Sequence, residues 1–361
     1  MGRRRTASAR RHAARSPAHL PRPGCCGQSR RRDHARLGAT ADHPRPRPLY
    51  RRRRDSGARS CPRLDRRQRA LIRLAIRCTA PICWTSVINN GTSVTRPAPV
   101  TVQEDLRRDH DLLCTAVREA GAIALDFFQR GPRHWDKQPG DPVSEGDLAV
   151  DSHLRERLGE ARPGYGWLSE EGADNEARLS AEKVWVVDPI DGTRSFIAGR
   201  PMFAVSVALV ENGRPIAGAI YNPAKDEFFD AIAGGGARFN GATCRVRATA
   251  DTKAAALLSS DSETRRNLWQ SRFPEAEIVS INAIAYKLGL VAAGLYDGVI
   301  ALKPKSDWDI AAGELLVAEA GGVMTTAEGG AFAYNGRDVI HPSVVAAAPA
   351  LVERLLARLA D

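Results

Sequence analysis

The chain has 361 residues and a formal net charge of +11, but its charge is divided unevenly. Residues 1–100 hold 25 Arg, 4 Asp and neither Lys nor Glu, whereas residues 101–361 hold 28 basic and 38 acidic residues. No stretch of 18 apolar residues occurs, and the second part has only two scattered cysteines, Cys114 and Cys244. Composition therefore excludes a membrane span and a disulfide framework, and favours an acidic cytoplasmic domain.

The first hundred residues predict a disordered extension, because runs such as Arg51–Arg54 repel themselves and cannot offset the entropy of folding. Three interpretations compete. The extension could be an arginine-rich arm that binds nucleic acid, or a targeting segment. The favoured interpretation is GC-rich DNA translated upstream of the real start, since Lys and Glu are absent beside abundant Arg, Pro and Ala. Nucleic-acid binding is the least favoured of the three.

The acidic part of the chain begins with two predicted helices. Apolar residues at helical spacing predict an amphipathic helix over about residues 103–128. Glycines and prolines predict a loop over 131–142. Ser144 then opens a second helix, which ends before Pro163.

Two predicted strands follow, and each ends at carboxylates. Residues 165–169 predict a short strand that delivers Glu170 and Glu171. Residues 184–187 read Val-Trp-Val-Val, an uninterrupted apolar run that is typical of a strand covered on both faces. The hexapeptide Asp-Pro-Ile-Asp-Gly-Thr comes directly after this run.

The hexapeptide predicts a turn that binds a metal ion and a phosphate. Pro189 has no N–H and cannot continue a strand ladder, while Gly192 lets the backbone approach a ligand closely. The carboxylates of Asp188 and Asp191 leave this turn three residues apart, so we expect them to point to one place. Thr193 is expected to cap a helix and to offer its N–H and hydroxyl to an anion.

The remaining chain mixes hairpins with helices. Strands 203–210 and 215–221 are joined across an Asn-Gly pair that is typical of a hairpin turn. Further elements are expected as strands at 226–233 and 323–325 and as helices at 282–293, 309–320 and 348–359. This order favours a layered α/β sandwich over a doubly wound sheet.

Four carboxylates stand at predicted strand ends or helix starts, namely Glu170, Asp188, Asp191 and Asp309. Each alone is explained as a helix cap or a solvated charge, and Asp309 in particular as an N-cap. Asp188 is harder to explain, since a carboxylate that ends an apolar strand costs free energy without a partner. Oxygen ligands with no convergent His or Cys favour magnesium or manganese over zinc.

Four motifs, in order, resemble those of the inositol monophosphatase superfamily, which comprises magnesium-dependent, lithium-sensitive phosphomonoesterases. The motifs are Val143-Ser144-Glu145-Gly146-Asp147, Leu168-Ser169-Glu170-Glu171, Asp188–Thr193 and Trp308-Asp309-Ile310-Ala311-Ala312-Gly313. The resemblance covers about residues 104–345, and the shared order makes it specific. It implies a phosphatase domain over 101–361, built as the alternating α-β-α-β-α sandwich of inositol monophosphatases and fructose-1,6-bisphosphatases.

The resemblance further implies two to three Mg²⁺ ions, with Mn²⁺ as a substitute. Glu170, Asp188 and the carbonyl of Ile190 would hold one ion. Asp188 would also bind the second ion, together with Asp191 and Asp309. Two such ions clamp the attacking water and the leaving oxygen, and lower the pKa of the water.

Catalytic and phosphate-binding roles follow from the same resemblance. Glu170 would also touch a weaker third ion near Lys137. Thr193, oriented by Asp147, would help Glu170 to position and deprotonate the water. The N–H groups of Gly192 and Thr193 would receive the phosphate. Hydrolysis would be direct and in line, without a covalent phosphoenzyme.

The choice of substrate depends on the loop before the Trp-Asp motif. Inositol-specific members carry a glutamate there that reads ring hydroxyls, and spacing places Leu302 at this position. Lys303 and Lys305 would instead meet a second phosphate, as on 3′-phosphoadenosine 5′-phosphate, or else form a solvated loop. We expect a 3′(2′),5′-bisphosphate nucleotidase, with an inositol-1-phosphate phosphatase and then a histidinol phosphatase as alternatives.

The expected partner is therefore a small phosphorylated metabolite. The resemblance alone implies a homodimer and inhibition by lithium. A non-enzymatic alternative is a protein that binds nucleic acid or a transcription complex through the basic arm. The complete set of predicted metal ligands argues against that alternative, because binding alone would not need them.

Overall fold

The computed structural model describes residues 100–360, with side chains from Gln103 onward, so the predicted extension lies outside the described residues. The helices are α2 (Val100–Arg130), α3 (Glu145–Ala161), the 3₁₀ helix η1 (Glu176–Ser180), α4 (Thr193–Ile197), α5 (Asp261–Arg265), α6 (Ile284–Ala292), α7 (Asp307–Glu319) and α8 (Pro349–Leu359). Within this part of the chain, no helix has the length and apolar character that a membrane span requires.

The strands form two large sheets and two small ribbons. The seven-stranded sheet contains β3 (Gly166–Ser169), β4 (Lys183–Asp191), β5 (Ala204–Glu211), β6 (Arg214–Asn222), β7 (Glu227–Ile232), β8 (Gly236–Phe239) and β9 (Ala242–Thr243), in that order. The five-stranded sheet has the order β11 (Glu277–Ser280), β10 (Ala256–Ser259), β12 (Gly298–Ala301), β16 (Val344–Ala347) and β14 (Val323–Thr325). The ribbons pair β1 (His134–Gln138) with β2 (Asp141–Ser144), and β13 (Lys305–Ser306) with β15 (Ile340–His341).

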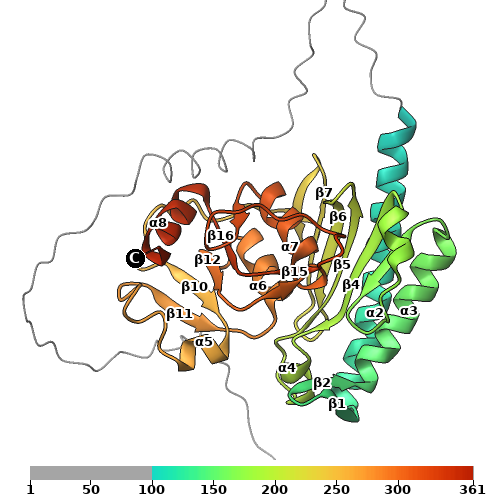
Figure 1. The fold of residues 1–361 in the computed structure, drawn as a ribbon, viewed down its shortest axis with the longest axis horizontal. Coiled ribbons are helices and arrows are strands. Elements are labelled where there is room, and N and C mark those ends of the chain that lie inside the picture. Colours follow the sequence, from blue (N-terminus) through green and yellow to red (C-terminus); the bar gives the residue numbers. More distant parts are fainter. Residues whose placement is uncertain (1–99, 361) are drawn as a thin grey trace, which may run out of the picture. The chain divides into compact units, whose positions relative to one another are not determined.

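The two sheets and the helices stack as alternating layers (Figure 1). Helices α2 and α3 cover one face of the seven-stranded sheet, where Leu113 and Leu154 share a core with Trp185. Helices α6 and α7 fill the space between the sheets. Helix α8 closes the outer face of the five-stranded sheet, with Leu351 packed in the same core as Val345. The predicted layered α-β-α-β-α sandwich is confirmed.

Most predicted elements recur with shifted ends, but the loop predicted over 131–142 is wrong. That segment contains the hairpin β1–β2, in which His134 pairs with Ser144. All five residues of β1 are exposed, so the strand lacks the alternation of apolar residues by which strands are recognised. Ser144 is the N-cap of α3, as predicted.

Strand β4 does not end at Val187 but continues into the hexapeptide and ends at Asp191. Asp188 pairs with Ser206 and Asp191 with Ala204, and the register shifts between the two pairs. This bulge tolerates Pro189, which has no N–H for a regular ladder. The two aspartates are therefore fixed by a bulged strand and not by a free turn.

Helix α7 lies against α6 at a glycine. A Cβ atom on Gly313 would stand 2.4 Å from Leu288 Cδ1 and 2.6 Å from Leu288 Cβ, which leaves no room for a side chain. The contact matters for function because α7 begins beside the acidic end of β4 and carries Asp309.

Gly313→Ala should therefore lower the free energy of unfolding by about 1–3 kcal/mol, since the added methyl group overpacks the α6–α7 contact. Gly159→Ala is the matched control, because Gly159 is also helical and a Cβ atom added there would have no neighbour within 4 Å. That control should be neutral or stabilise by about 0.5–1 kcal/mol. Urea unfolding of both variants measures the difference; equal effects would contradict the packing argument.

Candidate active site

Three carboxylates converge where the bulged end of β4 meets the first turn of α7. Asp188, Asp191 and Asp309 each offer one oxygen, and these oxygens lie within 4.8 Å of one another. Together with Glu170 they line a cavity of about 250 Å³. The structure therefore brings together all four carboxylates that the sequence singled out.

Asp188 is the most deeply buried of these acids, with 1% of its surface exposed. Its Oδ1 has no hydrogen-bond partner among the described residues. Burial raises the pKa of Asp188 well above its usual range, and the charges of Glu170, Asp191 and Asp309 raise it further. A buried carboxylate oxygen without a donor is costly, and a cation in the cavity would remove that cost.

Asp191 is held by the start of α6. Its Oδ1 accepts the N–H of Ile284 at 2.8 Å, and its Oδ2 accepts the N–H of Tyr286 at 3.0 Å. Burial nevertheless raises the pKa of Asp191 to about 7. Both oxygens are thus anchored by backbone, which fixes the plane of the carboxylate.

Asp309 is not an N-cap, which was the alternative to a metal-ligand role that the sequence left open. Ser306 is the N-cap of α7, and Asp309 occupies the third helical position, where its Oδ2 accepts the Ser306 N–H at 2.6 Å. That alternative is wrong because this capping box begins three residues upstream of the acid. Burial raises the pKa of Asp309, while Lys305 opposes the shift.

Glu170 follows β3, and its N–H donates to Val187 O at 3.2 Å, which sets it beside β4. Lys137, from the hairpin β1–β2, places its Nζ 3.6 Å from Glu170 Oε1 and 2.9 Å from Glu171 Oε1. Burial is the main cause that raises the pKa of Glu170, to about 8. The structure thus brings Lys137 to Glu170, but its shorter contact is with Glu171.

Thr193 and Asp147 also meet. Thr193 Oγ1 lies 3.1 Å from Asp147 Oδ1 and 3.1 Å from the carbonyl oxygen of Ile190. Asp147 is buried, which raises its pKa, and its Oδ2 accepts the N–H of Ser144 at 2.9 Å. These contacts fix the Thr193 hydroxyl at the edge of the cavity.

Position 192 requires a glycine for two reasons, its backbone angle and the closeness of its neighbours. Its φ is +90°, and an added Cβ would stand 2.9 Å from Ala283 Cβ and 2.9 Å from Met202 O. Gly192 is the N-cap of α4, so Thr193 is the first residue of that helix and not its cap. The predicted cap is therefore displaced by one residue.

The residues that line this cavity fit a hard divalent cation. Among them the carboxylates supply oxygen donors, and no His or Cys is present. Magnesium and manganese prefer such oxygen sets, whereas zinc sites are usually built with nitrogen or sulfur. The unpartnered Asp188 oxygen gives an independent reason to expect a cation here.

Several residues that line the cavity were missed in the sequence, among them Lys287 and Glu263. Lys287 lies on α6, is 1% exposed, and lines the cavity with Lys303 and Lys305. Burial lowers the pKa of Lys287 to about 8. A single charge inside the apolar helix Ile284–Ala292 is the signal that could have identified it.

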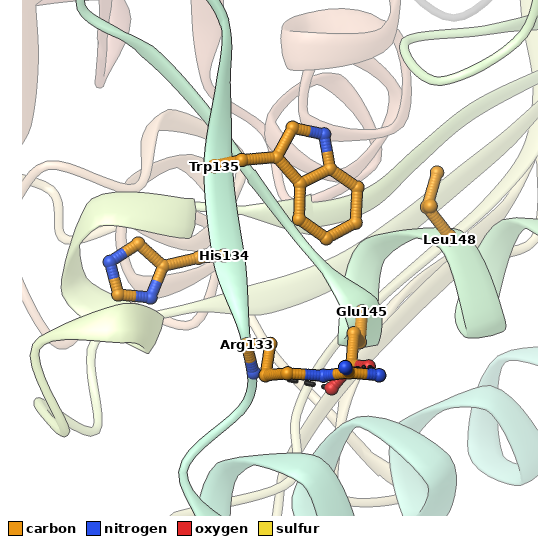
Figure 2. Close-up of a pocket in the computed structure, with 5 residues that line it drawn as sticks. All are labelled: Arg133, His134, Trp135, Glu145 and Leu148. Atoms are coloured by element: carbon orange, nitrogen blue, oxygen red, sulfur yellow. Dashed lines mark hydrogen bonds and ion pairs between the residues drawn. The ribbon is translucent and has the colours of Figure 1, made fainter.

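A second hollow lies at the surface beside the hairpin β1–β2, and Figure 2 shows its side chains. It is lined by Arg133, His134, Trp135, Glu145 and Leu148. Arg133 Nε donates to Glu145 Oε1 at 2.7 Å, while Trp135 and Leu148 are exposed. None of the predicted site residues lines this hollow.

Comparison with known proteins decides the family. Residues 105–361 match the family model described as "Inositol monophosphatase family". The chain belongs to the inositol monophosphatase family. This family consists of phosphatases that hydrolyse phosphomonoesters and depend on magnesium, so the chain is a phosphoric monoester hydrolase.

Relatives in this inositol monophosphatase family carry more than one name. The inositol-1-monophosphatase of Rhizobium meliloti (strain 1021) is 39% identical over 230 residues, which are 61% of this chain and 86% of the relative. Nus factor SuhB of Pasteurella multocida (strain Pm70) is 32% identical over 252 residues, 67% of this chain and 91% of the relative. The crystal structure of extragenic suppressor protein suhB from Bartonella henselae is 32% identical with a TM-score of 0.63, and the match covers 70% of this chain and 98% of that one.

For two residues of the carboxylate cluster we expect substitutions by asparagine to change the free energy of unfolding in opposite directions. Asp188→Asn removes a charge from repelling neighbours, so in EDTA it should raise the free energy of unfolding by about 0.5–2 kcal/mol. Asp191→Asn leaves an amide that cannot accept both the Ile284 and Tyr286 N–H groups, so in EDTA it should lower that free energy by about 1–3 kcal/mol.

Chemical denaturation with and without magnesium measures both effects. Magnesium should stabilise the wild-type chain, and the stabilisation should shrink in both variants because each loses a ligand. Changes of the same sign for the two variants in EDTA would contradict the assigned hydrogen bonding.

Proposed function

We propose that the chain hydrolyses a small phosphomonoester with two to three magnesium ions, for which manganese can substitute. Glu170, Asp188, Asp191 and Asp309 would hold the ions, with the carbonyl of Ile190 as a further ligand. The convergence of three carboxylates within 4.8 Å, one of them with an unpartnered oxygen, carries this proposal. Bound magnesium would neutralise phosphate charge and lower the pKa of the attacking water.

The chain's own groups would orient the reactants. Thr193 Oγ1, fixed 3.1 Å from Asp147 Oδ1, would position the attacking water, and Glu170 would accept its proton. The N–H groups of Gly192 and Thr193, at the start of α4, would receive the phosphate oxygens. A weaker third ion would bind near Lys137, whose Nζ lies beside Glu170.

We further propose that the substrate carries a second anionic group, as 3′-phosphoadenosine 5′-phosphate does. Two magnesium ions would balance the four carboxylates, whereas Lys287, Lys303 and Lys305 on the same cavity would keep their charge. Glu263 also lines this cavity, but its Oε1 already accepts the Leu302 N–H at 2.6 Å. Three lysines on one cavity favour an anionic ligand.

The names of the relatives favour a different substrate. Inositol-1-monophosphatase is the name of the Rhizobium meliloti relative, which supports inositol 1-phosphate as the second candidate. Histidinol phosphate is the third. A phosphate-release panel with magnesium, with and without lithium, compares these compounds with 3′-phosphoadenosine 5′-phosphate and fructose 1,6-bisphosphate. Lithium should inhibit each reaction that the site supports.

Asp191→Asn tests the reaction itself. It should lower phosphate release by about 100-fold or more, since even outer-shell partners of metal ligands contribute 10–100-fold. Full activity in this variant would refute the proposed metal-dependent mechanism, whichever substrate is used.

Lys287→Met tests the second anion with a matched pair of substrates. Adenosine 3′-phosphate lacks only the 5′-phosphate of 3′-phosphoadenosine 5′-phosphate. The variant should lower the preference for the bisphosphate, measured as the ratio of the two kcat/KM values, by about 10–100-fold, the effect of losing one charge-assisted hydrogen bond. Lys253→Met, at an exposed position outside the cavity, should leave the ratio unchanged. An unchanged ratio in Lys287→Met would remove the support for a bisphosphate.

We propose that residues 101–361 are the complete catalytic unit and act as a homodimer in the cytoplasm. The family match begins at residue 105, which supports this boundary. Deletion of residues 1–100 should leave magnesium-dependent phosphate release within about twofold, since every residue proposed for the reaction lies after residue 100. Light scattering of the deleted protein reports the oligomeric state.

The Pasteurella multocida relative is named as a Nus factor, and this name supports a binding role in transcription as the alternative to catalysis. The same deletion separates the two. RNA binding that is present in the full chain and lost with residues 1–100 would support the binding role; RNA binding absent from both would oppose it.

A further inference from the structure

A second cluster of metal-binding side chains lies between helix α2 and strand β7. His110 and Cys114 stand four residues apart on α2 and face Asp230 of β7. One donor atom from each lies within 4.8 Å of the other two. None of the three lines the carboxylate cavity, so the phosphatase reaction gives no reason for this grouping.

The separations of the donor atoms fit a tetrahedral zinc ion. His110 Nε2 lies 3.4 Å from Cys114 Sγ and 3.1 Å from Asp230 Oδ2. Zinc bonds of about 2.0–2.1 Å to nitrogen, 2.3 Å to sulfur and 2.0–2.2 Å to oxygen, at tetrahedral angles, would separate nitrogen from sulfur by about 3.5 Å and from oxygen by about 3.4 Å. For these two pairs the side chains would need to move by only a few tenths of an ångström, and the third pair, Cys114 Sγ and an Asp230 carboxylate oxygen, lies within 4.8 Å.

The fold holds these donors in place without a metal ion. His110 and Asp230 are 3% and 4% exposed, and the four-residue spacing stacks Cys114 over His110 on one helix face. One turn further along α2, Arg118 lies over the Phe228 ring, 3.6 Å from its centre, and fixes the helix against β7. Preorganised donors of this kind lower the cost of binding.

Arg238 of β8 supplies the outer contact that a ligating carboxylate usually has. Its Nε and Nη2 donate to Asp230 Oδ2 at 2.8 and 2.6 Å. The guanidinium charge weakens the attraction for a cation, and the negative charge of a Cys114 thiolate would offset it. On binding, the thiol proton passes to solvent and a metal–sulfur bond forms, so no redox partner is needed.

A nucleophilic or redox role for Cys114 is a poorer explanation of the cluster. Burial is the main cause that raises the pKa of Cys114 to about 12, so the metal-free thiol stays protonated and unreactive. Cys244, the other cysteine of the described residues, is also a free thiol.

We propose that His110, Cys114 and Asp230 form a site for a zinc-class divalent ion, with Zn²⁺ or Co²⁺ bound by one nitrogen, one sulfur and one oxygen. Cys114 is partly exposed, which leaves solvent access for a fourth ligand. Nitrogen and sulfur donors distinguish this site from the all-oxygen carboxylate cavity. A bound ion would tie the long helix α2 to the sheet, so the expected effect is on stability and not on phosphate release.

Cobalt titration of the full chain tests the site without substrate, since cobalt bound to a thiolate gives a charge-transfer absorption that carboxylate-bound cobalt lacks. Five further cysteines lie in residues 1–100, so the readout is the difference between variants. Cys114→Ser should remove one equivalent of this absorption, whereas the matched control Cys244→Ser should keep it. Identical cobalt spectra for the wild-type chain and Cys114→Ser would overturn the proposal.

Asp230→Asn provides a second test that keeps the thiol. It should weaken cobalt binding at the Cys114 thiolate by about 10-fold or more. Zinc should raise the unfolding temperature of the wild-type chain and of Cys244→Ser, and should not raise that of Cys114→Ser. Unchanged cobalt affinity in Asp230→Asn would reduce the cluster to a hydrogen-bonded network around a buried histidine. Magnesium-dependent phosphate release, measured in parallel, confirms that each variant is folded.

Discussion

The carboxylates at the end of β4 lie closer together than their charges favour, and much of the surrounding structure holds them there. Asp188, Asp191 and Asp309 bring oxygens within 4.8 Å of one another in a buried place, where like charges repel strongly. A chain without external constraint would separate them. The bulge in β4, the start of α6 and the first turn of α7 oppose that separation, because they hold the backbone or the carboxylate of each acid in place.

Each acid is restrained in a different way, and the difference matters for binding. Both oxygens of Asp191 accept hydrogen bonds from backbone N–H groups of α6. One oxygen of Asp309 accepts the N–H of the α7 N-cap, and its other oxygen is free. Asp188 has an oxygen with no partner among the described residues. A cation that enters this cavity therefore finds Asp191 and Asp309 held by backbone N–H groups and a free oxygen on Asp188, so little side-chain entropy remains to be lost at the two held acids.

The sequence predicts the acidic half of the site well because local signals mark it. The apolar run that precedes Asp188 and the capping serine before Asp147 can be recognised without knowledge of the tertiary structure. The hairpin β1–β2 escapes prediction because its first strand is exposed on both faces, and Asp309 is misplaced because a helix end shifts by two or three residues. Lys287 is harder still, since only the packing of α6 against α7 and the sheet turns it toward the carboxylates.

The cavity has an acidic half, formed by the four carboxylates, and a basic half, formed by the three lysines. The two halves differ in how they depend on the fold. The acidic half is built from strand ends and helix starts that belong to the layers of the sandwich. The basic half depends on Lys287 in the interior of α6, on Lys303 in a loop and on Lys305 in the short strand β13. Changes at Lys287 and Lys303 should cost little stability, because a buried lysine is itself unfavourable and Lys303 is exposed. Under the proposed function, substrate preference would depend on these lysines and would differ among chains that share the family's reaction but not this basic half.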